Sequence, residues 1–128
     1  MYLAIIQILR GKPAAAVELA KQETDPLWRT YALALAHFAN GDRAEADAAL
    51  KKLIDEDADD GGPQIATVYA LRKDPDKTLE WLEHAWSTHD AGATELLADP
   101  PLRAYKDDPR FIAFAQKIGV MPKAAPQP

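Results

Sequence analysis

Residues 40–46 read NGDRAEA, and a stretch of the same kind lies on either side of this one at a nearly constant distance. It returns 32 residues later as RKDPDKT (72–78), and GKPAAA (11–16) begins 30 residues before the glycine of the central stretch. A repeat of this length indicates a supersecondary unit that buries its apolar face only by stacking on its neighbours. The sequence therefore predicts an all-α fold of stacked helical pairs, with one of these turns inside each pair.

The residues that flank the turns predict where helices begin and end. Asp25-Pro26, Asp74-Pro75 and Asp108-Pro109 each place a capping carboxylate before a proline, and proline fits the first helical position. Gly41 is typical of the residue just past a helix end. Asp42, with a glutamate three residues later, predicts a capping box at the start of the following helix. These signals predict antiparallel helices joined by short turns.

The helix boundaries predict a single domain over residues 1–122, followed by a disordered tail at 123–128. The first helix is short for the repeat, and we therefore expect the natural N-terminus to lie further upstream. Near the other end, Phe111, Phe114 and Ile118 recur at helical spacing and predict a capping helix with one apolar side. Within the domain we expect helical pairs at about 1–23, 26–57 and 63–90 and a capping region at 93–119.

Composition and charge exclude several classes of partner. The formal net charge is -5 and the pI is about 5.1, whereas a nucleic-acid-binding domain normally carries a basic stripe. The same negative charge argues against binding to an anionic membrane surface. No apolar run approaches the roughly 18 residues of a transmembrane helix, and no basic residues precede the apolar start, so no signal peptide is predicted. We expect a cytoplasmic protein.

No catalytic or metal-binding pattern is found in the sequence. Ser87 is the only serine and the chain has no cysteine, so the common nucleophile motifs are missing. His84 and His89 are five residues apart, which is not the spacing that puts two imidazoles on one helical face. We therefore expect no enzymatic activity, no catalytic residue, no metal site and no cofactor. A packed or surface imidazole is the favoured interpretation of each histidine, His37 included.

The acidic segment 55–63, DEDADDGGP, raises the alternative of a calcium loop because Ca²⁺ takes carboxylate oxygens as ligands. An EF-hand loop needs a glycine at its sixth position and a glutamate at its twelfth, and neither is present. A solvated acidic loop between two helices is the favoured interpretation.

The repeat resembles the tetratricopeptide repeat (TPR) family, whose unit of two antiparallel helices has small residues where the helices cross. The strings IATVYA (65–70), EWLEHA (80–85), DPPL (99–102) and DPRF (108–111) are similar to a C-terminal TPR segment that closes larger bacterial signalling or regulatory proteins. This resemblance implies an α-α superhelix, or solenoid, of about three pairs with a C-terminal capping helix. The helix-crossing positions that it implies are Ala34, Ala46, Leu50, Ala66, Leu82 and Ala85.

The resemblance also implies a function, namely a protein-interaction scaffold that forms one module of a larger protein. Such scaffolds bind a protein or peptide on a concave face, which the first helix of each pair lines. Here an apolar peptide or helix is the expected partner. The alternative is self-association, a homodimer formed through the same apolar stripe. A third alternative is that the stripe packs against the first pair and only fills the core. The residues that map to the concave face are Trp28, Tyr31, Leu35, Phe38, Thr67 and Leu71.

Overall fold

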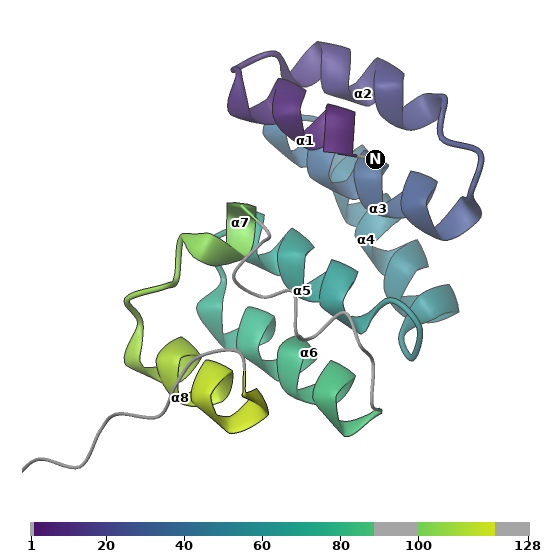
Figure 1. The fold of residues 1–128 in the computed structure, drawn as a ribbon. Helices are drawn as coiled ribbons and strands as arrows, with labels where there is room; N and C mark the ends of the chain where they lie inside the picture. The colour runs from purple at the N-terminus through teal and green to yellow at the C-terminus, as the bar shows by residue number, and fades with distance from the viewer. Residues whose placement is uncertain (1, 89–99, 120–128) are drawn as a thin grey trace, which may run out of the picture.

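The computed structural model describes residues 2–88 and 100–119, and in these residues it contains helices and no strand (Figure 1). This confirms the all-α class. The part of the predicted capping region between residues 93 and 99 and the predicted tail at 123–128 lie outside the described residues. The helices are α1 (Tyr2–Leu9), α2 (Pro13–Lys21), α3 (Pro26–Ala39), α4 (Arg43–Asp57), α5 (Gly62–Leu71), α6 (Pro75–Ser87), α7 (Pro100–Arg103) and α8 (Pro109–Ile118).

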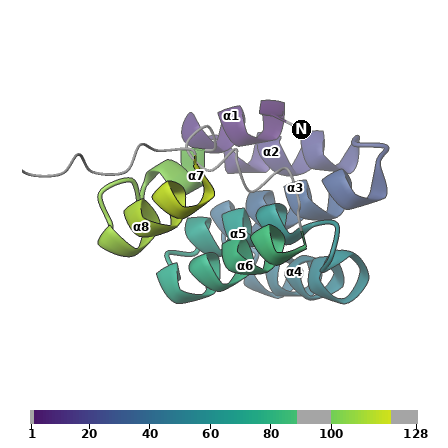
Figure 2. The same cartoon turned by 60° about the horizontal axis from the view of Figure 1, so that its bottom comes forward.

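Consecutive helices pack in pairs, α1 with α2, α3 with α4 and α5 with α6. The first helices of successive pairs also contact one another, so that α3 lies between α1 and α5, and α5 contacts α7 (Figure 1 and Figure 2). Helix α8 packs on α6 at the C-terminal end of the stack. None of the helices in the described part of the chain is long and apolar enough to cross a membrane.

The three turns that repeat in the sequence have one backbone geometry. Gly11, Gly41 and Lys73 occupy equivalent positions with φ of 74°, 83° and 59°, all in the left-handed region. The amide of the residue after each of them donates to the carbonyl five residues back, at 2.8, 2.8 and 3.0 Å respectively. This is the Schellman arrangement, which satisfies carbonyl groups that the end of a helix leaves unpaired. The repeat is therefore present in the hydrogen bonding of the backbone as well as in the sequence.

Small side chains lie where the helices approach one another most closely. All six predicted helix-crossing residues are buried, and Ala34, Ala46 and Ala66 are completely inaccessible to solvent. Gly62 at the start of α5 extends this pattern, because a Cβ atom added to it would lie 3.1 Å from Cβ of Ala85 on α6. At Gly62 and Ala85 the helix backbones leave no space for larger side chains, whereas the crossing positions of Leu50 and Leu82 hold large ones.

The capping helix α8 closes the core at its C-terminal end. Phe111, Phe114 and Ile118 are buried in a cluster with apolar residues of α5 and α6. Two ion pairs with α6 flank this cluster, Lys117 Nζ with Glu83 Oε2 at 2.8 Å and Arg110 with Asp76. The side of α8 that the sequence predicts to be apolar therefore packs against α5 and α6.

Three of the predicted helix starts have the expected caps. The carboxylates of Asp25, Asp74 and Asp108 accept hydrogen bonds from amide groups in the first turns of α3, α6 and α8, at 3.1, 3.1 and 2.9 Å. The predicted capping box at Asp42 is wrong. Its Oδ2 atom instead lies 2.9 Å from Nδ1 of His37, in the last turn of α3, and accepts a hydrogen bond at 3.0 Å from Asn40, which directly follows α3.

The acidic segment is shorter as a loop than the sequence predicts. Helix α4 continues to Asp57 and α5 begins at Gly62, so only residues 58–61 connect them. An ion pair between Lys51 and Asp55 lies on the last turns of α4. Within residues 2–88 and 100–119, no three His, Cys, Asp or Glu side chains lie together as a metal site requires. Burial and the neighbouring carboxylates of Glu56, Asp60 and Asp25 raise the pKa of Asp57.

Candidate functional site

A pocket of about 480 Å³ opens between the α5–α6 turn and α7. It joins two segments that are about thirty residues apart in the chain, and it depends on the contact between α5 and α7. Its walls are largely apolar, with two prolines and one aromatic ring, and they carry one cationic side chain. We call it the α5–α7 pocket. Its lining residues are Ala70, Leu71, Lys73, Pro75, Pro101, Ala104 and Tyr105.

Tyr105 fixes one wall of the α5–α7 pocket. Its ring stacks on Phe111 of α8, with centroids 4.8 Å apart and planes inclined by 14°. Its hydroxyl donates a hydrogen bond to the carbonyl of Ala70 on α5 at 3.4 Å. Burial, together with the carboxylates of Asp74 and Asp108, raises the pKa of Tyr105, so this hydroxyl stays protonated at neutral pH. The wall is thus held by contacts with two helices that belong to the core.

Lys73 is the charged residue of the α5–α7 pocket. It is exposed, and no carboxylate in the described part of the chain forms an ion pair with it. Residues with a side chain rarely adopt its left-handed backbone conformation, because the Cβ atom comes too close to the following carbonyl oxygen. The fold thus holds this side chain at the pocket in a conformation that glycine would adopt with less strain.

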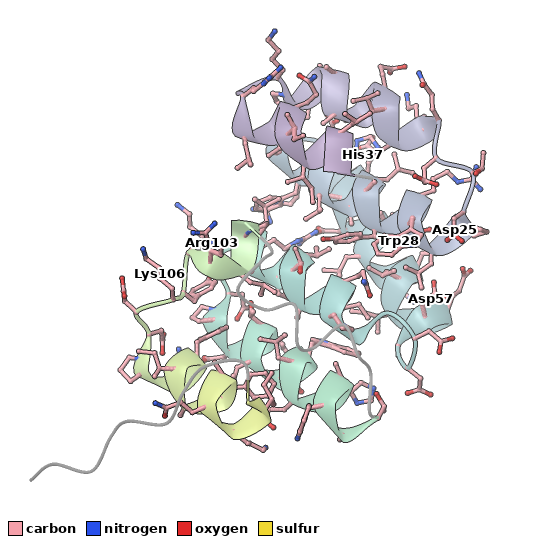
Figure 3. All side chains as sticks on the ribbon, viewed as in Figure 1. Asp25, Trp28, His37, Asp57, Arg103 and Lys106 are labelled. Carbon is pink, nitrogen blue, oxygen red and sulfur yellow. The ribbon has the colours of Figure 1, made fainter. Side chains whose placement is uncertain are left out.

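Two more cationic side chains belong to the segment that forms the α7 side of the pocket. Arg103 and Lys106 are exposed and point outward beside α7 (Figure 3). Neither has an ion-pair partner among the described residues. The acidic residues nearby have structural roles, since Asp74 caps α6 while Asp108 caps α8 and pairs with Arg110. The exception is the exposed Asp107.

The predicted concave stripe is only partly available to a partner. Tyr31 and Leu35 are 3% and 1% exposed, and both belong to a core cluster that also contains Ile5 of α1 and apolar residues of α4 and α5. Thr67 is 1% exposed, and its hydroxyl donates to the carbonyl of Pro63 at 3.1 Å. In this structure these three side chains are therefore not accessible to a partner, and their burial fits the alternative in which the stripe fills the core.

The other three residues of the stripe remain at least partly exposed, but they lie in different surroundings. Trp28 is 38% exposed, and its ring centroid lies 5.9 Å from that of Tyr31 near the start of α3 (Figure 3). Phe38 lies between two guanidinium groups, Arg43 at 4.9 Å and Arg72 at 5.0 Å from its ring centroid. Leu71 lines the α5–α7 pocket.

The cluster around Phe38 links adjacent pairs of helices. Arg72 at the end of α5 donates a hydrogen bond from Nη1 to Oδ1 of Asp47 on α4 at 2.7 Å, while its guanidinium lies against the Phe38 ring from α3. Cation–π contacts of this kind stabilise packing where the cation is largely removed from water. The arrangement joins three helices and explains the position of Phe38 without a ligand.

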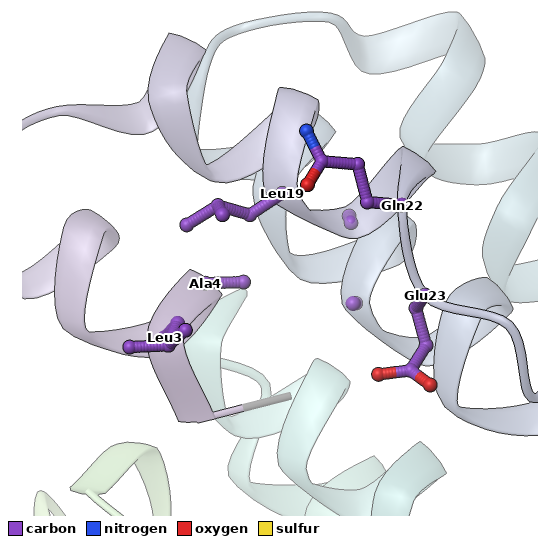
Figure 4. Close-up of a pocket in the computed structure, with 7 residues that line it drawn as sticks. Leu3, Ala4, Leu19, Gln22 and Glu23 are labelled. Carbon is purple, nitrogen blue, oxygen red and sulfur yellow. The ribbon is translucent and has the colours of Figure 1, made fainter.

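A second apolar surface lies on α1. Leu3, Ile6 and Leu9 are 63%, 40% and 65% exposed and recur at every third residue, so they share one side of the helix. Beside them is a smaller pocket of about 190 Å³ between α1 and α2 (Figure 4). Leu3 of α1 and Leu19 of α2 line it, and Glu23 lies at its edge (Figure 4).

Ser87, His84 and Asp59 are the residue types of a catalytic triad, but their hydrogen bonding does not suit one. The Ser87 hydroxyl donates to the backbone carbonyl of His84 at 2.7 Å and not to its imidazole. Nε2 of His84 lies 3.3 Å from Oδ1 of Asp59, and the side chain of Asp59 is 84% exposed. A triad needs its serine hydroxyl bonded to the imidazole that removes its proton.

Comparison with known proteins identifies no relative, since no family model, no curated protein and no solved structure matches this chain.

Proposed function

We propose that this chain is a non-enzymatic protein-interaction module of the TPR-like kind, and that it binds an apolar segment of a partner protein in the α5–α7 pocket. The observation that carries this proposal is the pocket itself. Its volume of about 480 Å³ lies within the range of roughly 300–1,000 Å³ that is typical of ligand sites, and its walls are mainly apolar.

The position of the pocket supports a peptide as the ligand. One wall comes from the end of α5 and the turn that follows it, and the other comes from α7 and the residues directly after it, so the pocket lies where these two segments meet. An apolar side chain of a bound segment can enter between Leu71 and Tyr105 while its backbone remains at the surface. Recognition of amphipathic segments commonly uses such anchor side chains in apolar grooves.

The repeated turns support the TPR-like part of the proposal. Three equivalent Schellman turns, spaced 30 and 32 residues apart, each connect the two helices of one pair. The first helices of the three pairs contact one another in chain order. A stack of this kind presents a surface formed by several helices, and helical-repeat proteins use such surfaces for binding.

A pocket-filling variant tests the proposal. Ala104 is exposed and lines the pocket, so Ala104→Trp fills it from the rim, whereas Ala48→Trp adds the same ring to an exposed site on α4 away from the pocket. Peptides selected from a displayed random library on the wild-type protein are expected to lose binding to Ala104→Trp and to retain it with Ala48→Trp. Leu71→Gln, which replaces an apolar lining residue by a polar one of similar size, is a second pocket variant. Circular dichroism verifies that each variant is folded. Equal binding of the selected peptides to all four proteins contradicts the proposal.

Self-association is a second candidate function, and the exposed face of α1 favours it. Leu3, Ile6 and Leu9 together form an apolar strip, and contiguous exposed apolar surface commonly marks an interaction site. Light scattering after size exclusion is the test. A dimer that Ile6→Glu dissociates supports this candidate, and a monomer at all concentrations argues against it.

A further inference from the structure

Lys73 differs from the residues at the two equivalent turns, and nothing in the turn requires the difference. Gly11 and Gly41 close the same Schellman hydrogen bonds with no side chain. A Cβ atom added to either glycine would meet nothing within 4 Å, so the position points to open space and not into the core. The lysine side chain is therefore not needed to complete the fold at this position. In addition, the left-handed backbone conformation disfavours any side chain here.

The Lys73 side chain does line the α5–α7 pocket. It is exposed, and so are the unpaired Arg103 and Lys106 on the segment of α7. The carboxylates of Asp74 and Asp108 are already engaged as helix caps and that of Asp76 pairs with Arg110, which leaves Asp107 as the exposed, unpaired acid of this region. Although the chain carries a net charge of -5, the unpaired charges around this pocket, which are those of Lys73, Arg103, Lys106 and Asp107, are positive on balance.

We infer that the segment bound in the α5–α7 pocket carries acidic side chains beside its apolar anchor, and that Lys73 pairs with one of them. This inference rests on the proposed function, because it names the chemistry of the peptide that the same pocket binds. The apolar walls take the anchor side chain, and the ammonium group at the pocket takes an Asp or Glu side chain a few residues away along the bound segment. Charge complementarity of this kind selects partners and orients them on encounter.

Three labelled peptides test the inference. Each has a Leu-Trp-Leu core, and the residues on both sides of the core are glutamate, serine or lysine. Fluorescence anisotropy gives the Kd of each peptide for the wild type, for Lys73→Gln and for Lys12→Gln. Lys12 is an exposed lysine beside the equivalent turn of the first pair, so Lys12→Gln makes the same change of charge away from the pocket.

The glutamate peptide is expected to bind the wild type about two- to fivefold more tightly than the serine peptide, which is the range of one exposed ion pair. Lys73→Gln should remove most of this advantage, and Lys12→Gln should retain it. Raising the ionic strength should reduce the advantage in the wild type, since salt screens exposed charges. The lysine peptide should bind least tightly.

The outcomes separate this inference from the proposed function. Equal affinity for the glutamate and serine peptides, or an advantage that persists in Lys73→Gln, overturns the inference while binding in the pocket still stands. If neither these peptides nor the library-selected ones bind, or if Ala104→Trp binds all of them as well as the wild type does, the proposed function fails and the inference with it. Sedimentation at the same protein concentrations tests whether a second copy of the chain occupies the pocket. A dimer that Ala104→Trp dissociates would place that second copy there and would overturn both the proposed function and the inference.

Discussion

Replacing Lys73 with glycine should stabilise the protein, although Lys73→Gly removes a side chain. At φ of 59° the lysine is in the left-handed region, which costs an L-residue about 1–2 kcal/mol relative to the right-handed conformation. Glycine avoids this cost but has more conformational freedom in the unfolded chain, which offsets about 0.4–1 kcal/mol. The mid-range values of these two terms leave a net gain of about 0.8 kcal/mol. For a chain of this size we expect the Tm to rise by about 2–4 °C.

Urea unfolding and thermal melting of Lys73→Gly measure this gain. The matched control is Gly41→Lys, which puts a lysine into the equivalent turn, where a Cβ atom meets nothing within 4 Å. Because the surroundings of Gly41 add no steric term, the control isolates the backbone conformation and should lower the free energy of unfolding by a similar amount. If Lys73→Gly melts at or below the wild-type temperature while Gly41→Lys is unchanged, backbone strain is not what distinguishes the third turn.

Three further changes test the packing and the charges of the fold. Ala46→Leu should overpack the contact between α3 and α4 because Ala46 is 0% exposed. We expect it to cost about 1–3 kcal/mol in urea unfolding. Unfolding within error of wild type would show that this crossing is not tightly packed. Phe114→Ala should lower the free energy of unfolding by about 3–5 kcal/mol, because Phe114 is 2% exposed and belongs to the cluster that closes the core. A decrease of less than about 1 kcal/mol would contradict a capping role for α8. Asp57→Asn should raise the Tm at pH 7, because the raised pKa of Asp57 means that its ionised form destabilises the folded state. This gain should shrink as the pH falls through the ordinary aspartate range near 3.8, and a gain that is independent of pH would exclude ionisation as its cause.

Asp108 should have the opposite pH dependence in the same acid titration. Hydrogen bonds from the Arg110 backbone and side chain lower the pKa of Asp108, so its ionised form stabilises the folded state above the ordinary value of 3.8. The contribution is lost as the pH falls below that value. Comparison of the Tm of wild type and Asp108→Ala across this range measures it, and a difference that stays constant in acid would contradict the ionised cap.

Local signals in the sequence predicted the helices well because each signal has a local physical cause. Asp25, Asp74 and Asp108 cap the helices that follow them, since each carboxylate needs only an amide two or three residues away. The repeat also placed Gly41 and Lys73 at equivalent turns, and both have positive φ. The crossing alanines came from the resemblance to the TPR family, and Ala34 and Ala66 also recur at the 32-residue offset of the repeat.

Competing partners and contacts between distant segments account for what the sequence did not predict. The capping box at Asp42 fails because His37 and Asn40, at the end of the preceding helix, compete for the same carboxylate. The concave stripe is partly buried because Tyr31 and Leu35 pack in a cluster with residues of α1, α4 and α5, and spacing within α3 alone does not reveal which neighbour covers which side. The α5–α7 pocket requires α7 to pack beside the α5–α6 turn, and no motif in either segment predicts that contact.

The backbone conformation and the charge of Lys73 are separable by choice of substitution, and this separation tests why the third turn carries a lysine. Lys73→Gln keeps a side chain in the left-handed conformation and removes the charge, so it should leave the Tm nearly unchanged and reduce the preference for the glutamate peptide. Lys73→Gly removes both the strain and the charge, so it should raise the Tm and reduce the same preference. Lys73→Arg keeps both and should resemble the wild type in each measurement. A side chain that lowers the stability of the fold indicates a role outside the fold. For Lys73 that role is binding only if two results hold together. The preference for the glutamate peptide must be lost whenever the charge is removed, and the Tm must rise only when the side chain itself is removed.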